Sequence, residues 1–171
     1  MKFLKSKIIF ILVISLLSTL KAQELAEKYL VISLLSTLKA QELAEKYEVK
    51  LIEKIVMGIT GKSYPKICTV NYPVDRIKEY STYLVISSCK QADMVIAGTD
   101  ELESFDKPIL LIGDTEIKDR KDVIGAIFWK KGRPQIIFID KNLKRFDIQI
   151  PREYNKYIIK KDSLKYAEAV F

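Results

Sequence analysis

Residues 124–140 read IGAIFWKKGRPQIIFID, and this stretch decides how the carboxyl-terminal part of the chain folds. Two runs rich in β-branched and aromatic residues flank Lys131-Gly132, where glycine can supply the positive φ of a tight hairpin turn. Pro134 stands just after the turn, near a strand end, where a missing backbone donor is tolerated. The stretch therefore predicts two antiparallel strands at one edge of a β-sheet.

Four short apolar runs precede the hairpin, and each predicts a β-strand. None alternates strictly between apolar and polar residues, which is typical of strands covered on both faces. A helical pattern at Pro73–Tyr80 separates the first run from the second, and this alternation of strand and helix predicts an α/β fold with mostly parallel strands. The predicted strands are Lys66–Asn71, Thr82–Ser87, Asp93–Gly98 and Pro108–Gly113.

Three further segments have helical patterns. Apolar residues recur at spacings of three and four over Ala40–Thr60, which predicts a helix there. After the hairpin, the letters KNLKRF predict a short helix capped by Asp140 or Asn142. We expect Pro151 to open another helix over 152–161, continued by the tail. The expected fold is a three-layer α/β sandwich with a mixed, mostly parallel sheet that ends in an antiparallel hairpin, preceded by a long N-terminal helix.

An internal repeat occupies the amino-terminal region. Residues 12–29 read LVISLLSTLKAQELAEKY, and residues 30–47 repeat the same eighteen letters. Eighteen residues make about five whole turns of α-helix, so a helix that carries the copy is longer by about 27 Å. Because the copy spans whole turns, the apolar stripe of such a helix is not rotated. The duplication is therefore compatible with one continuous helix.

The amino terminus resembles an export signal. Its first seven residues, MKFLKSK, contain three lysines and no acid, and an apolar run at 8–20 precedes the letters KAQ. This order is typical of a secretory signal, and the run is shorter than the about 20 residues that span a bilayer. We expect a signal peptide at 1–22, cleaved after Ala22. The copied site at Ala40 leaves a second cleavage point open, and an uncleaved anchor or a buried helix are the alternatives.

Export and the repeat together predict the domain organisation. The signal at 1–22 overlaps the first copy, a duplicated helical segment follows at 23–47, and one α/β domain occupies 48–171. A stretch of this length is enough for a single hydrophobic core. The expected location is the periplasm, with attachment to the membrane if the signal stays uncleaved.

Charge makes nucleic acid an unfavourable partner. The chain has 29 basic and 22 acidic residues, a formal net charge of +7. Four of the lysines fall within 1–22, so 25 basic residues against 22 acidic ones remain beyond it, a net charge of +3. Acidic residues are interspersed with these cations, unlike the basic face of a nucleic-acid-binding domain.

Histidine is absent and cysteine is scarce. A count of zero histidines excludes His-based triads, histidine metal ligands and imidazole acid–base chemistry. The two cysteines, Cys68 and Cys89, are consistent with an exported protein. They form one disulfide if their strands are neighbours, or they remain two small buried thiols, and the sequence leaves both open.

Residues with potential chemistry are explained better by turns and caps. Asp100, Asp114 and Asp140 each follow a predicted strand, where carboxylates in open α/β sheets can hold a divalent cation. We favour capping, because their spacing matches no metal-binding loop. The letters SSC at 87–89 lack a histidine partner and a nucleophile-elbow motif, and the glycines form no phosphate-binding pattern. The sequence predicts no catalytic site, no metal and no cofactor.

The hairpin end is the most distinctive candidate surface. Here an aromatic pair stands beside three cations, which suits an acidic partner or lipid headgroups. The alternative is a solvated turn with a half-buried tryptophan, because charged hairpin ends commonly protect a sheet edge. An open hairpin edge would instead add a strand to a partner. The candidate contact residues are Phe128, Trp129, Lys130, Lys131 and Arg133.

Residues 107–158 resemble the carboxyl-terminal half of the YfiR-type periplasmic proteins, which restrain membrane-bound diguanylate cyclases. The matching features are KPILLIGD, the hairpin stretch continued by KNLKRFDIQIP, and a closing helix at REYNKYI. The order of signal, first helix and first strand also agrees for residues 45–70. The double glycine usual before the hairpin in that family is here Ile124-Gly125.

The resemblance implies a periplasmic regulator without catalysis of its own. Its implied partner is an inner-membrane signalling protein, contacted on the outer face of the membrane. A second hypothesis is a periplasmic small-molecule binding protein that uses the strand ends near Asp100 and Asp114. An enzyme is not expected, because no residue pattern favours one.

Overall fold

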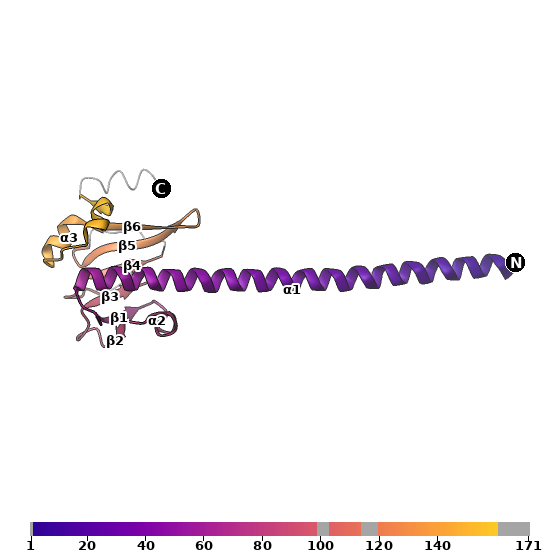
Figure 1. The fold of residues 1–171 in the computed structure, drawn as a ribbon, viewed down its shortest axis with the longest axis horizontal. Coiled ribbons are helices and arrows are strands. Elements are labelled where there is room, and N and C mark those ends of the chain that lie inside the picture. Colours follow the sequence, from indigo (N-terminus) through magenta and orange to yellow (C-terminus); the bar gives the residue numbers. More distant parts are fainter. Residues whose placement is uncertain (1, 99–102, 114–119, 161–171) are drawn as a thin grey trace. The chain divides into compact units, whose positions relative to one another are not determined.

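The computed structural model describes residues 2–98, 103–113 and 120–160, with side chains from residue 28 onward. The chain divides into two compact units, Met1–Ala44 and Glu45–Phe171. Figure 1 shows the order of the elements, which begins with the long helix α1 (Lys2–Thr60).

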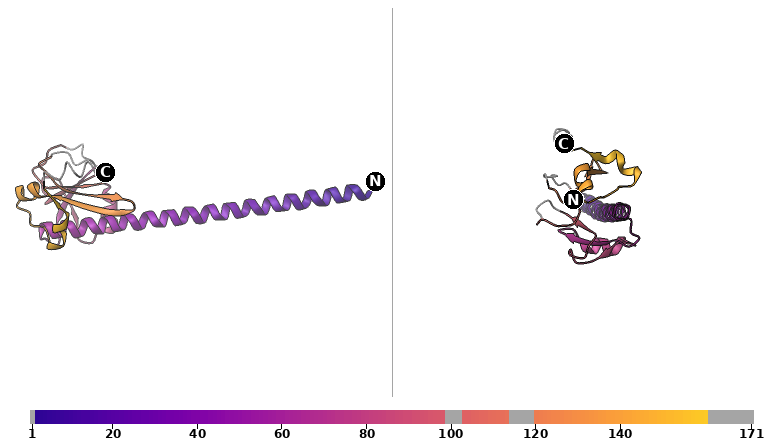
Figure 2. Two further views of the ribbon diagram at one scale, coloured as in Figure 1. Left: turned by 90° about the horizontal axis from the view of Figure 1, so that it is seen from above. Right: turned by 90° about the vertical axis from the view of Figure 1, so that its left-hand side faces the viewer.

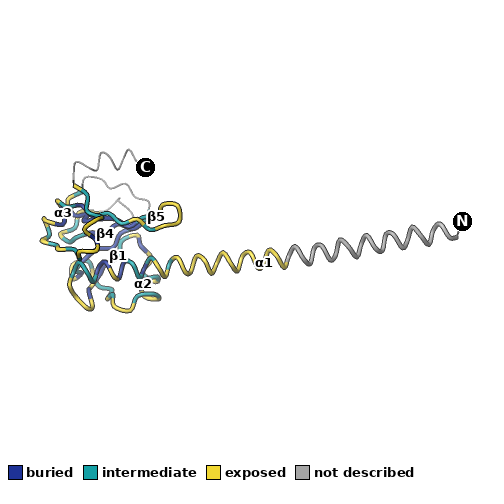
Figure 3. Tube along the Cα trace, turned by 45° about the horizontal axis from the view of Figure 1, so that its top comes forward, coloured by how far each residue is buried: buried dark blue, intermediate teal, exposed yellow. Residues whose placement is uncertain are grey.

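The long N-terminal helix expected from the sequence is confirmed, and it begins further upstream than the apolar periodicity indicated. α1 covers 59 residues, including both copies of the repeat. In the first unit, residues 28–44 are exposed to solvent (Figure 3). Eight large apolar side chains of this stretch are between 53% and 70% exposed: Tyr29, Leu30, Val31, Ile32, Leu34, Leu35, Leu38 and Leu43.

The second unit is built on a seven-stranded sheet with the order β2-β1-β3-β4-β5-β6-β7. Neighbouring strands are parallel except β5 and β6, which form the antiparallel hairpin. This sheet, preceded by α1, confirms the predicted α/β sandwich. The strands are β1 (Lys66–Val70), β2 (Val85–Ile86), β3 (Met94–Ala97), β4 (Ile109–Ile112), β5 (Val123–Lys130), β6 (Arg133–Ile139) and β7 (Ile158–Ile159).

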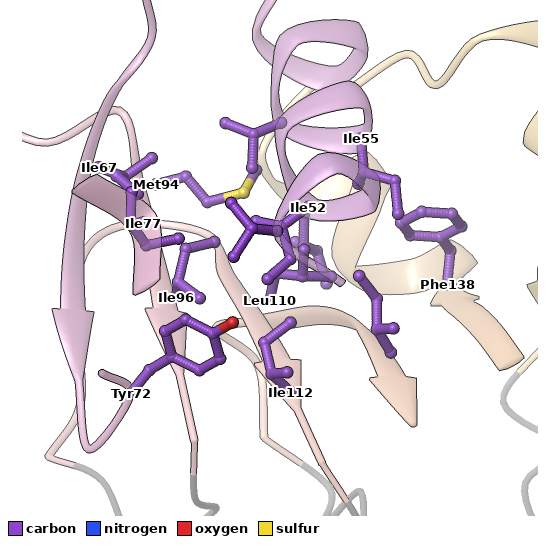
Figure 4. Close-up of a cluster of buried hydrophobic side chains, with 14 of the residues drawn as sticks. Ile52, Ile55, Ile67, Tyr72, Ile77, Met94, Ile96, Leu110, Ile112 and Phe138 are labelled. Atoms are coloured by element: carbon purple, nitrogen blue, oxygen red, sulfur yellow. The ribbon is translucent and has the colours of Figure 1, made fainter. Parts of the chain in front are cut away.

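Residues 45–60 of α1 lie beside the sheet (Figure 2) and supply one side of the main core. Ile52 and Ile55 are fully buried among strand residues such as Leu110 (Figure 4). Burying one such side chain contributes about 1.5–3 kcal/mol, so a single turn of helix contributes strongly to stability. Two short helices add to the same cluster, α2 (Val74–Tyr80) through Ile77 and α3 (Asp140–Arg145) through Leu143.

A second apolar cluster covers the opposite face of the sheet. In β3, Met94 and Ile96 belong to the cluster beside α1, whereas Val95 and Ala97 belong to the second cluster. Side chains alternate between faces along a strand, so a strand buried on both faces needs apolar residues at every position. This arrangement explains why the apolar runs in the sequence do not alternate.

Two predicted elements differ from the structure. β2 contains only Val85–Ile86 of the run predicted as a strand. The helix predicted over 152–161 is wrong, because a short 3-10 helix, η1 (Arg152–Tyr157), is followed by β7. Ile158–Ile159 pair in parallel with the end of β6, and tertiary pairing overrides the local helical pattern there. The helix predicted for the tail lies outside the described residues.

The predicted caps of α3 are also wrong. The residue before the helix is Ile139, and it makes no side-chain cap. Asn142 is buried, and its Nδ2 donates to the carbonyl oxygens of Arg120 at 2.7 Å and Val123 at 2.6 Å. Asp140 accepts a hydrogen bond from Lys144 Nζ at 2.7 Å. Asn142 therefore ties α3 to the start of β5 instead of closing the end of its own helix.

Candidate functional site

The hairpin predicted from residues 124–140 is confirmed. β5 and β6 pair from Gly125 opposite Phe138 to Lys130 opposite Arg133, which leaves a two-residue turn. Both turn residues have positive φ, 50° at Lys131 and 72° at Gly132, as this tight turn requires. Residues 123–139 contain no acid, so the hairpin segment carries a net positive charge, which comes from the cations at its end.

The residues predicted as a contact surface are divided between the two faces of the hairpin. Phe128 packs with the cluster on the face that lacks α1, and Lys130 shares that face because side chains alternate along a strand. Arg133 lies opposite Lys130 in the register. Trp129 faces the other way, toward α1. The structure thus gathers three exposed cations at the tip and separates the two aromatic rings.

Trp129 is anchored to α1 through Glu48. Its Nε1 donates a hydrogen bond of 2.9 Å to Glu48 Oε2, and its ring meets the Tyr47 ring edge to face, with centroids 6.3 Å apart. The Tyr72 hydroxyl donates to the other oxygen, Glu48 Oε1, at 2.8 Å. Both oxygens of the Glu48 carboxylate therefore accept a hydrogen bond. Trp129 is half-buried, as expected for the alternative in which the hairpin end is a solvated turn.

The same carboxylate lies near a cation. Arg76 Nη1 is 4.0 Å from Glu48 Oε1, and Arg76 Nη2 pairs with Glu45 Oε1 at 2.9 Å. Burial and the negative charge of Glu48 raise the pKa of the Tyr72 phenol above its usual value, so the hydroxyl keeps the proton that it donates. The cluster joins α1, α2 and β5 where the parallel strands β1 and β5 end.

Sequence reasoning missed this cluster, although one signal was present. Glu48 stands four residues before Ile52 and seven before Ile55, on the apolar stripe of the helix. An acid on a buried stripe needs donors, because an unpaired buried charge is costly. The donors come from residues 24 and 81 positions away, and the spacing in the sequence does not identify them.

The outer edge of the hairpin is protected against pairing with another strand. In a two-residue hairpin the pair that closes the turn bonds across it, so the backbone of Pro134 and Ile136 faces outward. Proline has no N–H, and the Pro134 carbonyl oxygen accepts a bond of 3.1 Å from Gln135 Nε2. β7 covers the far end of β6. These features protect an edge, and they leave few backbone groups for a partner strand.

The strand order reverses at β1, which lies between β2 and β3. Open α/β sheets commonly bind ligands beyond the carboxyl ends of strands at such a point. Here the backbones approach closely, because a Cβ on Gly98 would lie 2.1 Å from the Asn71 carbonyl oxygen. Asp100 and Asp114, which the sequence suggests as ligand-binding residues at these strand ends, lie outside the described residues.

Glu53 forms a second polar anchor on α1. Its Oε2 accepts from Ser81 Oγ at 2.6 Å and from the backbone N–H groups of Thr82 at 2.6 Å and Tyr83 at 2.9 Å, and its Oε1 accepts from Lys50 Nζ at 2.9 Å. Burial alone would raise the pKa of this carboxyl, but the hydrogen bonds outweigh it and lower the pKa from 4.5 to about 2. Glu53 thus holds the connection between α2 and β2 against α1.

The two cysteines are joined. A disulfide links Cys68 on β1 to Cys89 in the loop before β3, with 4.9 Å between their Cα atoms. Cys68 is buried in the second cluster, and Cys89 packs against it. Of the two possibilities that the sequence left open, the structure contains the bonded form.

A shallow hollow of about 310 Å³ lies at the amino-terminal ends of β3 and β4. Its polar rim includes an ion pair of 2.6 Å between Lys62 Nζ and Asp93 Oδ1. Burial would raise the pKa of Asp93, but the hydrogen bonds from Lys62 and from the Lys66 backbone, with the charges of Lys62 and Lys107, outweigh burial and lower the pKa. Lys107 also lines the hollow. Apolar residues also line the hollow, Met94 and Phe146 among them. The hollow lies at the opposite ends of the parallel strands from the Glu48 cluster.

Among the residues with described side chains, no group of three or more acidic or cysteine side chains is placed to hold a metal ion. Over the same part of the chain, helices carry no apolar stretch long enough to cross a bilayer. Comparison of the chain with protein-family models, with curated proteins and with solved structures finds no match. The resemblance to YfiR-type proteins therefore stays a prediction from the sequence.

Proposed function

We propose that the protein is an exported periplasmic regulator that acts by non-catalytic contact with an inner-membrane signalling protein. The observation that carries the proposal is the end of the β5–β6 hairpin. Lys130, Lys131 and Arg133 are exposed there, and the hairpin holds no acid. Complementary charge accelerates association and selects the partner, so this tip suits an acidic surface. The resemblance to YfiR-type proteins supplies the class of partner.

Trp129 acts in this proposal as a positioning residue. Its bond to Glu48 fixes the strand that presents the cations, and Phe128 packs the other face of the same strand onto the sheet. A hairpin strand that is packed on both faces loses less conformational entropy when it binds a partner. The cations contact the partner, and the two aromatic residues determine where those cations stand.

A crosslinking pull-down with a charge-reversed hairpin tests the proposal. Lys130→Glu, Lys131→Glu and Arg133→Glu together should abolish recovery of the membrane partner, because each substitution replaces attraction by repulsion. The matched control reverses three exposed cations elsewhere, Lys90→Glu, Lys141→Glu and Arg145→Glu, and should keep recovery within about twofold of the unchanged protein. Equal loss in both variants would show that net charge, and not the hairpin, governs recovery.

The alternative function, a periplasmic small-molecule binding protein, is favoured by the hollow beside Lys62 and Lys107. Its volume of about 310 Å³ reaches the lower end of the range for ligand sites. Two lysines against one aspartate suit a small anion with an apolar part. If such a metabolite is recovered with the purified protein and no membrane partner is recovered, the function of a small-molecule binding protein is favoured over that of a regulator.

A further inference from the structure

The second copy of the repeat places a second signal-like segment directly before the folded unit. Residues 30–38 form an apolar run of nine, and Lys39-Ala40-Gln41 follows it, as Lys21-Ala22-Gln23 follows the first run. Nine residues fall within the about 7–15 that such apolar segments have. Both copies thus offer an export peptidase the same small residue after an apolar run.

Every residue of this second run is exposed to solvent. Leu30, Val31 and Ile32 are 62%, 53% and 57% exposed, and successive helical residues point about 100° apart. The apolar residues therefore occupy a face of about 200°, which is wider than the stripe of about 100° that a surface helix buries against a protein core. Cleavage after Ala22 would leave this run at the start of a protein in water.

The described core of the second unit is formed by residues beyond this stretch. The buried core residues of α1 begin at Val49, and the ion pair of Glu45 with Arg76 is the first polar contact within the second unit. A chain that begins at Gln41 retains both, together with Glu48 and Glu53. A cut before Gln41 removes the exposed apolar run and preserves every anchor described above.

We propose that the mature protein begins at Gln41, and this inference rests on the export step of the proposed function. A membrane-bound export peptidase hydrolyses the amide between Ala40 and Gln41. Water supplies the hydroxyl of the new Ala40 carboxyl group and the proton of the new Gln41 amine. Both copies of the apolar run leave with the signal. The structure thus shifts the cleavage point from Ala22, which the sequence favoured, to the second copy.

The repeat itself provides the test. A variant that lacks residues 30–47 carries one copy, and cleavage after its only Ala22 site gives a chain identical to residues 41–171. The full chain and this deletion variant, each with the same carboxyl-terminal tag, are expressed in a bacterium with a periplasm. We expect the two periplasmic products to have the same intact mass, although their precursors differ by eighteen residues.

Two matched substitutions assign the site within the full chain. A bulky residue before the bond blocks a site that requires a small one, so Ala40→Tyr should eliminate the product that begins at Gln41. Ala22→Tyr changes the same letter in the other copy and should leave that product unchanged. A periplasmic product that begins at Gln23 would overturn the inference and leave export intact. An unprocessed chain in the cytoplasm would overturn both the inference and the proposed function.

Discussion

Glu48 is the residue on which the position of the hairpin end depends. Its two carboxylate oxygens accept from Trp129 and Tyr72, so Glu48→Ala leaves two donors without an acceptor. We expect the free energy of unfolding to fall by about 2 kcal/mol, the usual cost of unpaired buried groups. Trp129 is the single tryptophan of the chain, so its fluorescence during urea unfolding reports the change directly.

An exposed glutamate provides the control for this substitution. Glu79 lies on α2 and is exposed, so Glu79→Ala should change stability by less than about 0.5 kcal/mol. Glu48→Gln retains one acceptor oxygen and should fall between the two. Equal stability of the Glu48→Ala and Glu79→Ala variants would contradict the role assigned to Glu48.

Glu53 makes stability depend on pH. Because its folded pKa of about 2 lies below the ordinary value of 4.5, its contribution is complete above pH 4.5 and is lost as the pH falls toward 2. A shift of this size corresponds to a contribution on the order of 3 kcal/mol. The measurement is the free energy of unfolding between pH 7 and pH 2, from urea titrations.

Glu53→Gln isolates this contribution from those of other acids. The variant cannot titrate at this position, so its stability should fall less steeply than that of the unchanged protein between pH 4.5 and 2. Asp93 and Asp122, whose pKa values are also lowered although burial opposes the shift, remain in both proteins and cancel in the difference. Parallel pH profiles for the two proteins would refute the assignment.

Among the elements, the carboxyl ends of β1 and β3 are held by a close backbone contact. Gly98 N–H donates to the Val70 carbonyl oxygen at 3.0 Å, and no room remains for a side chain beside Asn71. Gly98→Ala must push the strands apart, and we expect a loss of about 3 kcal/mol, comparable with overpacking of a core. Thermal unfolding followed by circular dichroism measures it.

The turn glycine is the matched control for that prediction. Gly132 has φ of 72° and open space where a Cβ would stand, so Gly132→Ala meets backbone strain alone. Its expected cost is about 1 kcal/mol. A larger loss at Gly132 than at Gly98 would show that the close contact between β1 and β3 is less restrictive than described.

The disulfide between β1 and the loop before β3 restrains the unfolded chain. Its cysteines are 21 positions apart, and a closed loop of this length contributes about 3 kcal/mol in the chain-entropy model. Cys68→Ala with Cys89→Ala should lower the free energy of unfolding by about that amount. Adding reductant should destabilise the unchanged protein and leave the double variant unaffected. A reductant effect of equal size in both proteins would exclude the disulfide as its source.

The elements that could be predicted from the sequence are those with local signals. The Lys131-Gly132 turn, the runs that became β1, β3 and β4, and the helix ending at Thr60 all follow from local patterns. β7 could not be predicted, because two isoleucines after a helical pattern become a strand only when β6 is beside them. The role of Asn142 depends on carbonyl groups 19 and 22 positions away, which no cap pattern reveals.

For the molecule as a whole, the candidate site could be predicted only in part. The exposed cations at the hairpin end are recognisable from the letters WKKGR. The anchor beneath them is not, because Glu48 and Trp129 are 81 positions apart and meet only once α1 packs on the sheet. Long-range polar contacts of this kind depend on the tertiary fold, and periodicity contains no information about them.

The exposed run at 30–38 leads to a prediction about the intact chain. Unless it is removed, eight exposed large apolar side chains remain between residues 29 and 43, and exposed apolar surface favours association in water. The full chain should therefore self-associate at lower concentration than the chain 41–171, as measured by sedimentation velocity. The two chains should have the same stability within about 0.5 kcal/mol, because the core of the second unit is unchanged. In a chain that begins at Gln23, and so lacks the apolar run at 8–20, Leu34→Glu with Leu35→Glu and Leu38→Glu should give a monomer in sedimentation velocity. If that variant still associates, a surface other than residues 30–38 causes the association.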